Sequence, residues 1–97
     1  MLSGKQKRYL RSEAHHIQPT FQVGKSGVTD NMVSQLSDLL EKRELIKISV
    51  LQNCLEDKDD IAKQLTERLE AHLVQIIGNM IILYKESLEH KSIQLPN

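Results

Sequence analysis

The 97-residue sequence has little cysteine, proline, glycine or aromatic content. Cysteine occurs once, at Cys54, and aromatic residues make up 3% of the chain, with no tryptophan. A single cysteine excludes an intramolecular disulfide and the multi-cysteine patterns that bind zinc. We expect Cys54 to be a half-buried thiol at the end of a strand, and Phe21 and Tyr84 to lie in the core.

Long hydrophobic runs are missing as well. No stretch approaches the ~18 apolar residues of a membrane span, and Leu2 is followed at once by Ser3-Gly4-Lys5 rather than by the apolar segment of a signal peptide. The length suits one domain with a modest core. We therefore expect a single domain over residues 1–97, in a monomeric cytoplasmic protein that does not associate with membranes.

Catalytic patterns are also scarce. No Ser/His/Asp or Cys/His set stands in a supporting context, and the Gly24-Lys25-Ser26 string lacks the glycine that a P-loop needs five residues earlier, because position 19 is proline. Adjacent His15 and His16 would point about 100° apart on a helix, which disfavours a shared metal. N-capping explains the acidic run 57–60 without Mg²⁺. We expect no enzyme, metal, cofactor or small-molecule substrate.

Charge is balanced over the whole chain but unevenly distributed. The sequence has 13 basic and 13 acidic residues, yet residues 1–28 carry a net charge of +4 and residues 56–70 carry −3. Such segregation lets a neutral protein present a basic surface to a polyanion. The acidic block also solvates one helix, which is compatible with the first interpretation. The basic residues of the first segment are Lys5, Lys7, Arg8, Arg11 and Lys25.

Hydrophobic periodicity predicts an alternating order of elements. Residues 3–17 read as a helix that starts with a Ser3/Gln6 capping box, and Thr29 is the predicted N-cap of a second helix that runs to about residue 42. A third helix starts at Asp57. Strands are predicted over residues 20–23, 44–51, 72–77 and 80–85, with a tight Gly78-Asn79 turn between the last two.

This order, helix–strand–helix–strand–helix–strand–strand, favours an α/β fold in which helices pack on a four-stranded mixed sheet. In the strand 44–51, alternation predicts one buried face (Ile46, Ile48, Val50) and one solvent face that carries Lys47. The polar tail 86–97 has two open outcomes, docking on the domain or staying loose.

The most informative segment joins the first strand to the second helix. The apolar run ends at Val23, the chain passes through Gly24-Lys25-Ser26-Gly27, and the helical pattern begins at Thr29. Glycines permit close backbone approach, and a helix N-terminus offers free N–H groups and a positive dipole end. The Gly-x-x-Gly loop of KH domains clamps a nucleic-acid backbone in this manner. We therefore predict a phosphate-contacting loop.

Four stretches, spread over nearly the whole chain, together carry a family resemblance. They are Leu2-x-Gly4-Lys5-Gln6-x-Arg8-x-Leu10-Arg11-x-x-Ala14-His15, Val23-Gly24-Lys25-Ser26-Gly27-Val28-Thr29, Glu44-Leu45-Ile46-Lys47-Ile48 and Gly78-x-x-Ile81-x-Leu83-Tyr84-Lys85. The chain resembles the CRM domain family (chloroplast RNA splicing and ribosome maturation), in particular its small stand-alone bacterial members, the YhbY-like proteins.

The resemblance implies a four-stranded α/β domain similar to the C-terminal domain of a bacterial translation initiation factor. It also implies RNA binding and association with precursors of the large ribosomal subunit, a 23S rRNA precursor or pre-50S particle. Because aromatics are few, base stacking is a minor contribution, and backbone and shape recognition dominate. The predicted RNA-binding residues are Gly24, Lys25, Ser26, Gly27, Lys5, Lys7, Arg8, Arg11 and Lys47.

A second hypothesis from another class stays open. The third predicted helix carries a dense set of acidic residues, among them Asp59, Asp60 and Glu67. An exposed acidic helix is a suitable docking surface for a protein partner, so the chain is alternatively a protein–protein adaptor. The two activities are compatible.

Overall fold

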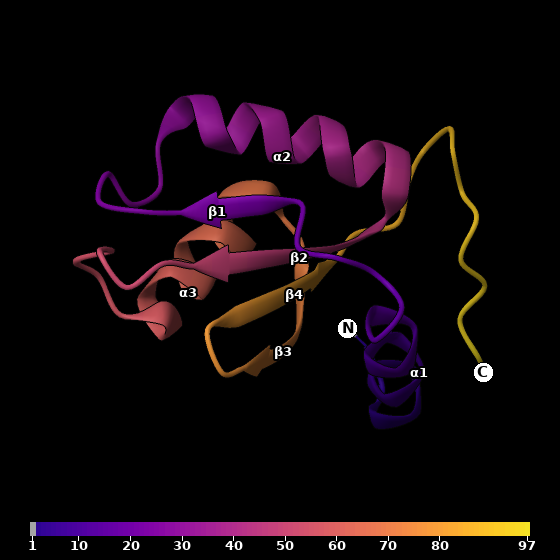
Figure 1. Cartoon of the computed structure of the whole chain (residues 1–97). Coiled ribbons are helices and arrows are strands. Elements are labelled where there is room, and N and C mark those ends of the chain that lie inside the picture. The colour runs from indigo at the N-terminus through magenta and orange to yellow at the C-terminus, as the bar shows by residue number, and fades with distance from the viewer. Residues whose placement is uncertain (1) are drawn as a thin grey trace.

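A four-stranded mixed sheet forms the centre of the computed structural model, which describes residues 2–97 (Figure 1). Its strands are β1 (Phe21–Val23), β2 (Leu45–Val50), β3 (His72–Ile77) and β4 (Met80–Tyr84), in the spatial order β1-β2-β4-β3. β1 is parallel to β2, and the other neighbours are antiparallel. With α1 (Gly4–Ala14), α2 (Asp30–Arg43) and α3 (Lys58–Leu69), the predicted α/β class and element order are confirmed.

Helices cover the two faces of this sheet unequally. α2 and α3 pack on one face around Ile46, Ile48 and Ile81, where the main core lies. α1 packs on the other face, where Leu10 joins a smaller cluster with Tyr84. Side chains alternate between faces along a strand, so residues one apart in β2 serve different cores.

The prediction that the second strand is half-buried is wrong for β2. Five of its six residues are buried, and only Lys47 is partly exposed. Leu45 packs under α1 in the smaller cluster, and the Asn79 side chain donates a hydrogen bond to Ser49 Oγ at 3.3 Å. The alternating pattern of β2 predicted a solvent-exposed second face. It could not show that α1, which is distant in the sequence, covers part of that face.

Capping residues explain two of the helix starts. The Ser3/Gln6 capping box and the Thr29 cap are both confirmed. Asp57 occupies the N-cap position of α3, but its side chain makes no capping hydrogen bond, so the predicted capping role of that carboxylate is wrong. α1 also ends at Ala14 rather than at residue 17, because the chain tightens there and the His15 N–H donates to Ser12 O.

The remaining core predictions concern single side chains. Tyr84 is buried, and Phe21 packs partly buried against the main core, as predicted. Cys54 is partly exposed just beyond β2, and its Sγ–H donates to the Glu56 carbonyl at 3.5 Å. At the β3–β4 turn, Gly78 has a φ of 58°, which favours glycine.

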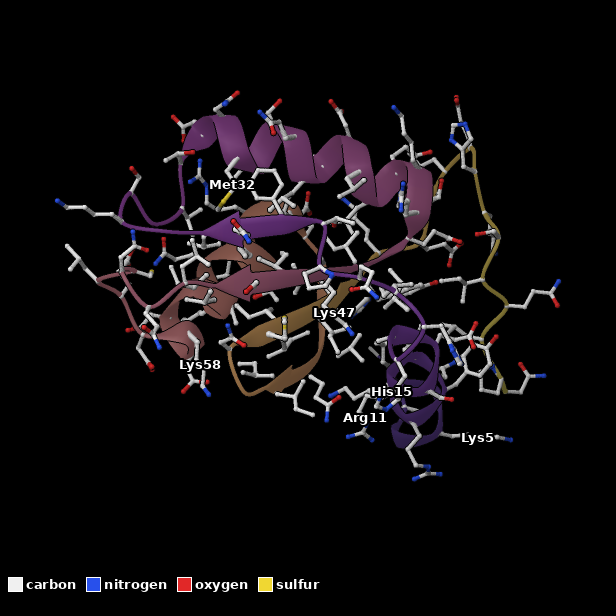
Figure 2. All side chains as sticks on the ribbon, viewed as in Figure 1. Lys5, Arg11, His15, Met32, Lys47 and Lys58 are labelled. Carbon is white, nitrogen blue, oxygen red and sulfur yellow. The ribbon has the colours of Figure 1, made fainter. Side chains whose placement is uncertain are left out.

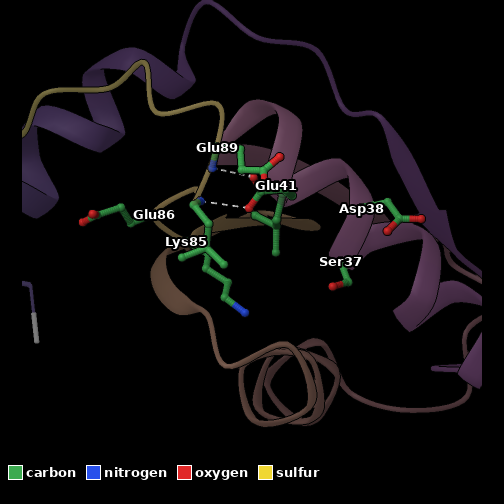
Figure 3. A pocket seen from close by; sticks show the side chains of 8 residues that line it. Ser37, Asp38, Glu41, Lys85, Glu86 and Glu89 are labelled. Carbon is green, nitrogen blue, oxygen red and sulfur yellow. Dashed lines mark hydrogen bonds between the residues drawn. The ribbon is translucent and has the colours of Figure 1, made fainter.

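The tail 86–97 docks on the domain, which resolves the alternative left open by the sequence. Two glutamates at the end of α2 hold it. The buried Glu44 carboxylate accepts N–H groups from Ser87, Ser92 and Ile93 at 2.7–2.9 Å. Glu41 accepts N–H groups from the residues that follow Ser87, as dashed lines show in Figure 3.

Hydrogen bonding sets the ionisation of both carboxyls. The Leu88 N–H, the Ser87 hydroxyl and the Glu89 N–H lower the pKa of Glu41 to about 2. Burial acts to raise the pKa of Glu44, but the donors from Ser87, Ile93 and Ser92 outweigh it and lower that pKa. Each carboxylate therefore stabilises the folded state fully above pH 4.5, and this contribution is lost as the pH falls through the folded-state pKa.

Replacing Glu44 by Gln should loosen the tail. The variant keeps the side-chain shape but exchanges a charged acceptor of several N–H groups for a neutral amide, which should lower the free energy of unfolding at pH 7 by about 2 kcal/mol. Trypsin should then cleave faster after Lys91. The gap between parent and variant should narrow as the pH falls below 4.5 and close once the pH has passed the lowered folded-state pKa of Glu44.

Urea unfolding at several pH values measures this effect, with Glu67→Gln on the exposed side of α3 as the matched control. Equal stability of parent and Glu44→Gln at pH 7, with unchanged cleavage after Lys91, would show that the Glu44 carboxylate does not hold the tail.

Candidate nucleic-acid interface

The predicted phosphate loop is a tight turn between β1 and α2. The Gly27 N–H donates to Gly24 O at 3.0 Å, and Gly27 has a φ of 66°, which side-chain-bearing residues rarely adopt. A Cβ built on Gly27 would lie 2.5 Å from a Glu56 carboxylate oxygen. Position 27 therefore requires glycine for both backbone conformation and space.

Lys25 and Ser26 form the exposed tip of this turn, whereas Gly27 is buried beneath it. The Gly27 amide is already used within the turn. Any phosphate that approaches the loop consequently meets Lys25 Nζ, the Ser26 hydroxyl and the amides of the tip. The four predicted loop residues thus form one turn. Lys25 and Ser26 are available to a ligand, whereas Gly24 and Gly27 allow the backbone conformation of the turn.

A neighbouring loop adds residues that sequence reasoning missed. The segment 51–57, between β2 and α3, lies beside the turn at the left of Figure 1. A Cβ on Gly24 would lie 3.4 Å from Asn53 Oδ1, and the Glu56 carboxylate lies next to Gly27. Glu56 also accepts a hydrogen bond from Gln64 at 2.7 Å. No local sequence signal connects these loops, because they meet only through the pairing of β1 with β2.

The N-terminus of α2 is less suited to phosphate than the sequence indicated. Thr29 Oγ1 already accepts the Met32 N–H at 3.2 Å. Asp30 adds a carboxylate to the first turn and pairs with Arg68 from α3. A carboxylate at this position satisfies the helix dipole and repels a second anion. The favourable approach to the loop is therefore at Lys25, away from Asp30.

The remaining predicted cations lie on the side of the sheet that carries α1. Lys5, Lys7 and Arg8 are exposed on α1, and Arg11 is partly exposed. Figure 2 shows Lys47 of β2 on the same side as Arg11 and His15. The structure thus joins Lys47 to the α1 cations and places the Lys25 loop at the other end of the sheet (Figure 1).

The opposite face of the molecule is acidic. The exposed carboxylates of α2, α3 and the cap that follows α3 outnumber the exposed cations of the two helices. The carboxylates are Asp30, Asp38, Asp59, Asp60, Glu67 and Glu70, and the cations are Lys42, Arg43, Lys63 and Arg68. A hollow of about 460 Å³ at the end of α2 is lined by further acidic side chains, including Glu86 and Glu89 (Figure 3). Lys85, which also lines it, donates to the Leu69 carbonyl at 2.9 Å. The charge segregation in the sequence therefore becomes a basic α1 side and an acidic α2/α3 side.

Within residues 2–97, no group of three or more His, Cys, Asp or Glu side chains is arranged to hold a metal ion. His15 and His16 lie exposed in the turn after α1, without a third ligand among the described residues. No helix in this part of the chain is long and apolar enough to cross a membrane.

Comparison with known proteins places these features in a family. Residues 2–85 match the CRS1 / YhbY (CRM) domain. The chain is 64% identical over 96 residues to the "Probable RNA-binding protein YqeI" of Bacillus subtilis (strain 168), covering 99% of this chain and 100% of that one. It is 38% identical to an "RNA-binding protein" of Haemophilus influenzae, covering 98% and 95% of the two chains.

A solved structure shares the fold. The solution structure of the hypothetical protein SAV1595 from Staphylococcus aureus superposes with a TM-score of 0.82 at 57% sequence identity, and the match covers 99% of this chain and 100% of that one. The match of residues 2–85 spans the sheet, all three helices and the Gly24–Gly27 turn. The chain belongs to the CRS1 / YhbY (CRM) domain family.

Proposed function

We propose that this protein binds RNA without catalysing a reaction, and that its target is a precursor of the large ribosomal subunit. One observation carries the proposal. A chain with zero net charge gathers the α1 cations and Lys47 on one side of the sheet and most of its exposed carboxylates on the α2/α3 side. Relatives with 64% and 38% identity that are named as RNA-binding proteins support it.

The contacts are mainly to the RNA backbone. Lys25 supplies charge at the loop tip, and the Ser26 hydroxyl donates a hydrogen bond to phosphate or sugar. The α1 cations and Lys47 extend the basic surface, and each phosphate that they bind releases counterions from the RNA. Tyr84 is buried and therefore offers no stacking surface. Backbone and shape recognition suit structured rRNA.

The acidic side limits how this protein meets RNA. Because the exposed carboxylates of α2 and α3 outnumber the exposed cations there and repel phosphate, a polyanion is favoured to approach the α1 side and the Lys25 loop. A one-sided approach favours a preformed rRNA surface, such as that of the 23S rRNA precursor in a pre-50S particle, over free RNA. We propose further that the protein acts in the cytoplasm as a monomer.

The exposed acidic side also supports a second candidate function. Asp59, Asp60 and Glu67 are all exposed on α3, and a basic protein segment would complement them. An adaptor of this kind would lose its partner when these carboxylates are neutralised and would be indifferent to Lys25. The two functions are separable by these substitutions.

We predict that changing Lys25 and Ser26 together to Asp weakens binding to precursor rRNA by about tenfold or more, because a cation and a donor are replaced by two anions. Both side chains are exposed, so the thermal melt should be unchanged. Filter binding with purified precursor rRNA measures the effect. Ser34→Asp with Lys63→Asp, at exposed sites of α2 and α3, makes the same charge change elsewhere and should bind like the parent.

The loop is not the site if the Lys25/Ser26 variant binds like the parent while its melt is unchanged. Equal losses in this variant and in the α2/α3 control would mean that overall charge, rather than position, governs binding.

Neutralising Lys7, Arg8 and Arg11 to Gln should weaken binding and reduce the slope of log K against log salt by up to about 3 units, because the slope counts the phosphates that the protein neutralises. The control replaces Lys42, Lys63 and Arg68 by Gln, which removes the same charge from the α2/α3 side and should leave the slope near that of the parent. An unchanged slope in the α1 variant would move the RNA surface away from this helix.

In a cell lysate fractionated at low magnesium, the protein should sediment with large-subunit precursors and be scarce in translating polysomes. With about four phosphates bound, its affinity should fall about a hundredfold between about 50 and 200 mM salt, so added salt should strip it. Finding it only at the top of the gradient at every salt concentration would remove the ribosome assignment and favour the adaptor.

A further inference from the structure

α1 covers only one end of the sheet face on which it packs. Leu10 and Ala14 of α1 reach Leu45, Ile82 and Tyr84, which lie toward that end. Beyond this cover, the strand register aligns one residue from each strand: Gln22 pairs with Ser49, Ser49 with Met80, and Met80 with Ile77. We call these four residues the open row.

The open row is accessible and uncharged. Gln22 is exposed, Met80 is partly exposed, and Ile77 is 49% exposed although it is a large apolar side chain. Ser49 is the one buried member, held by the Asn79 amide. The adjoining position of β3 adds a partly exposed Gln75, opposite Ile82. The surface therefore offers amides at both edges and an apolar strip between them.

Cations flank this surface on both sides. Lys25 follows β1 just beyond Gln22, and Lys47 occupies the neighbouring outward position of β2. Arg11 lies beyond Lys47 on α1 (Figure 2). An RNA strand whose phosphates bind these cations would lay its bases over the uncharged row between them. A protein partner would have no comparable need for cations on both sides of an apolar strip.

The chemistry of the row fits unpaired bases. A glutamine amide both donates and accepts hydrogen bonds, as base edges require, and Met80 with Ile77 offers a flat apolar contact without aromatic stacking. Four strands spaced about 4.8 Å apart span about 14 Å. A four-stranded sheet of this kind accommodates two or three bases in RNA-recognition domains.

We propose that the open row contacts two or three unpaired RNA bases and gives the protein a sequence preference, with Gln22 and Gln75 reading base edges. This inference rests on the proposed RNA binding and adds a specificity surface to it. The cations provide affinity for any RNA backbone, and the amides discriminate among single-stranded sequences.

The test is a selection of ten-nucleotide single-stranded RNAs from a random library, followed by affinity measurements for the enriched sequence and a scrambled one. Gln22→Ala with Gln75→Ala should weaken binding of the enriched RNA by about tenfold, leave the scrambled RNA unaffected and keep the salt slope. Ile77→Ser should act in the same direction. The matched controls, Gln35→Ala with Gln94→Ala and Leu88→Ser, should retain the preference.

The alternatives are distinguishable. Binding without enrichment, or a preference that survives Gln22→Ala with Gln75→Ala, would overturn the inference and leave RNA binding standing. No binding of any RNA at about 50 mM salt would overturn the proposed function as well. A protein that sediments as a dimer without RNA, and as a monomer after Ile77→Ser, would show that a second copy covers the row, which also overturns the inference.

Discussion

The position of β2 is the constraint on which the rest of the structure depends. It lies between β1 and β4, and its side chains supply both cores. Ile46 and Ile48 anchor α2 and α3, while Leu45 lies under α1. Lys47 is partly exposed at the edge of the sheet area that α1 covers. Because these residues alternate along one strand, the acidic helices and the basic helix are held on opposite faces.

In the function that we propose, this separation lets a chain without net charge bind a polyanion from one side. The cations of α1 and Lys47 share a face with the open row, and the Lys25 turn borders the same face at the end of β1. The opposing carboxylates restrict orientation. On this proposal the cations provide affinity, the opposing carboxylates provide orientation, and the open row provides base preference. The sheet fixes the positions of all three.

Local signals in the sequence predicted most of the fold. The capping residues Ser3 and Thr29 and the turn at Gly78 act over a few residues, so they could be identified without the structure. The glycine loop and the N-terminal cations were likewise local patterns, and the family resemblance added the precursor of the large ribosomal subunit as their expected target. Long-range contacts could not be predicted: the Glu44 clasp of the tail, the approach of Glu56 to Gly27, and the strand order that aligns Gln22 with Ile77. Each depends on segments far apart in the chain.

Ultraviolet crosslinking of the protein to RNA in cells, with the crosslinked peptides identified by mass spectrometry, tests one-sided RNA binding most directly. We expect crosslinks in residues 3–17, 20–28, 47–49 and 75–80, which form the α1 side, the loop and the open row. Crosslinks concentrated in residues 30–43 and 58–70, on the acidic helices, would contradict one-sided binding.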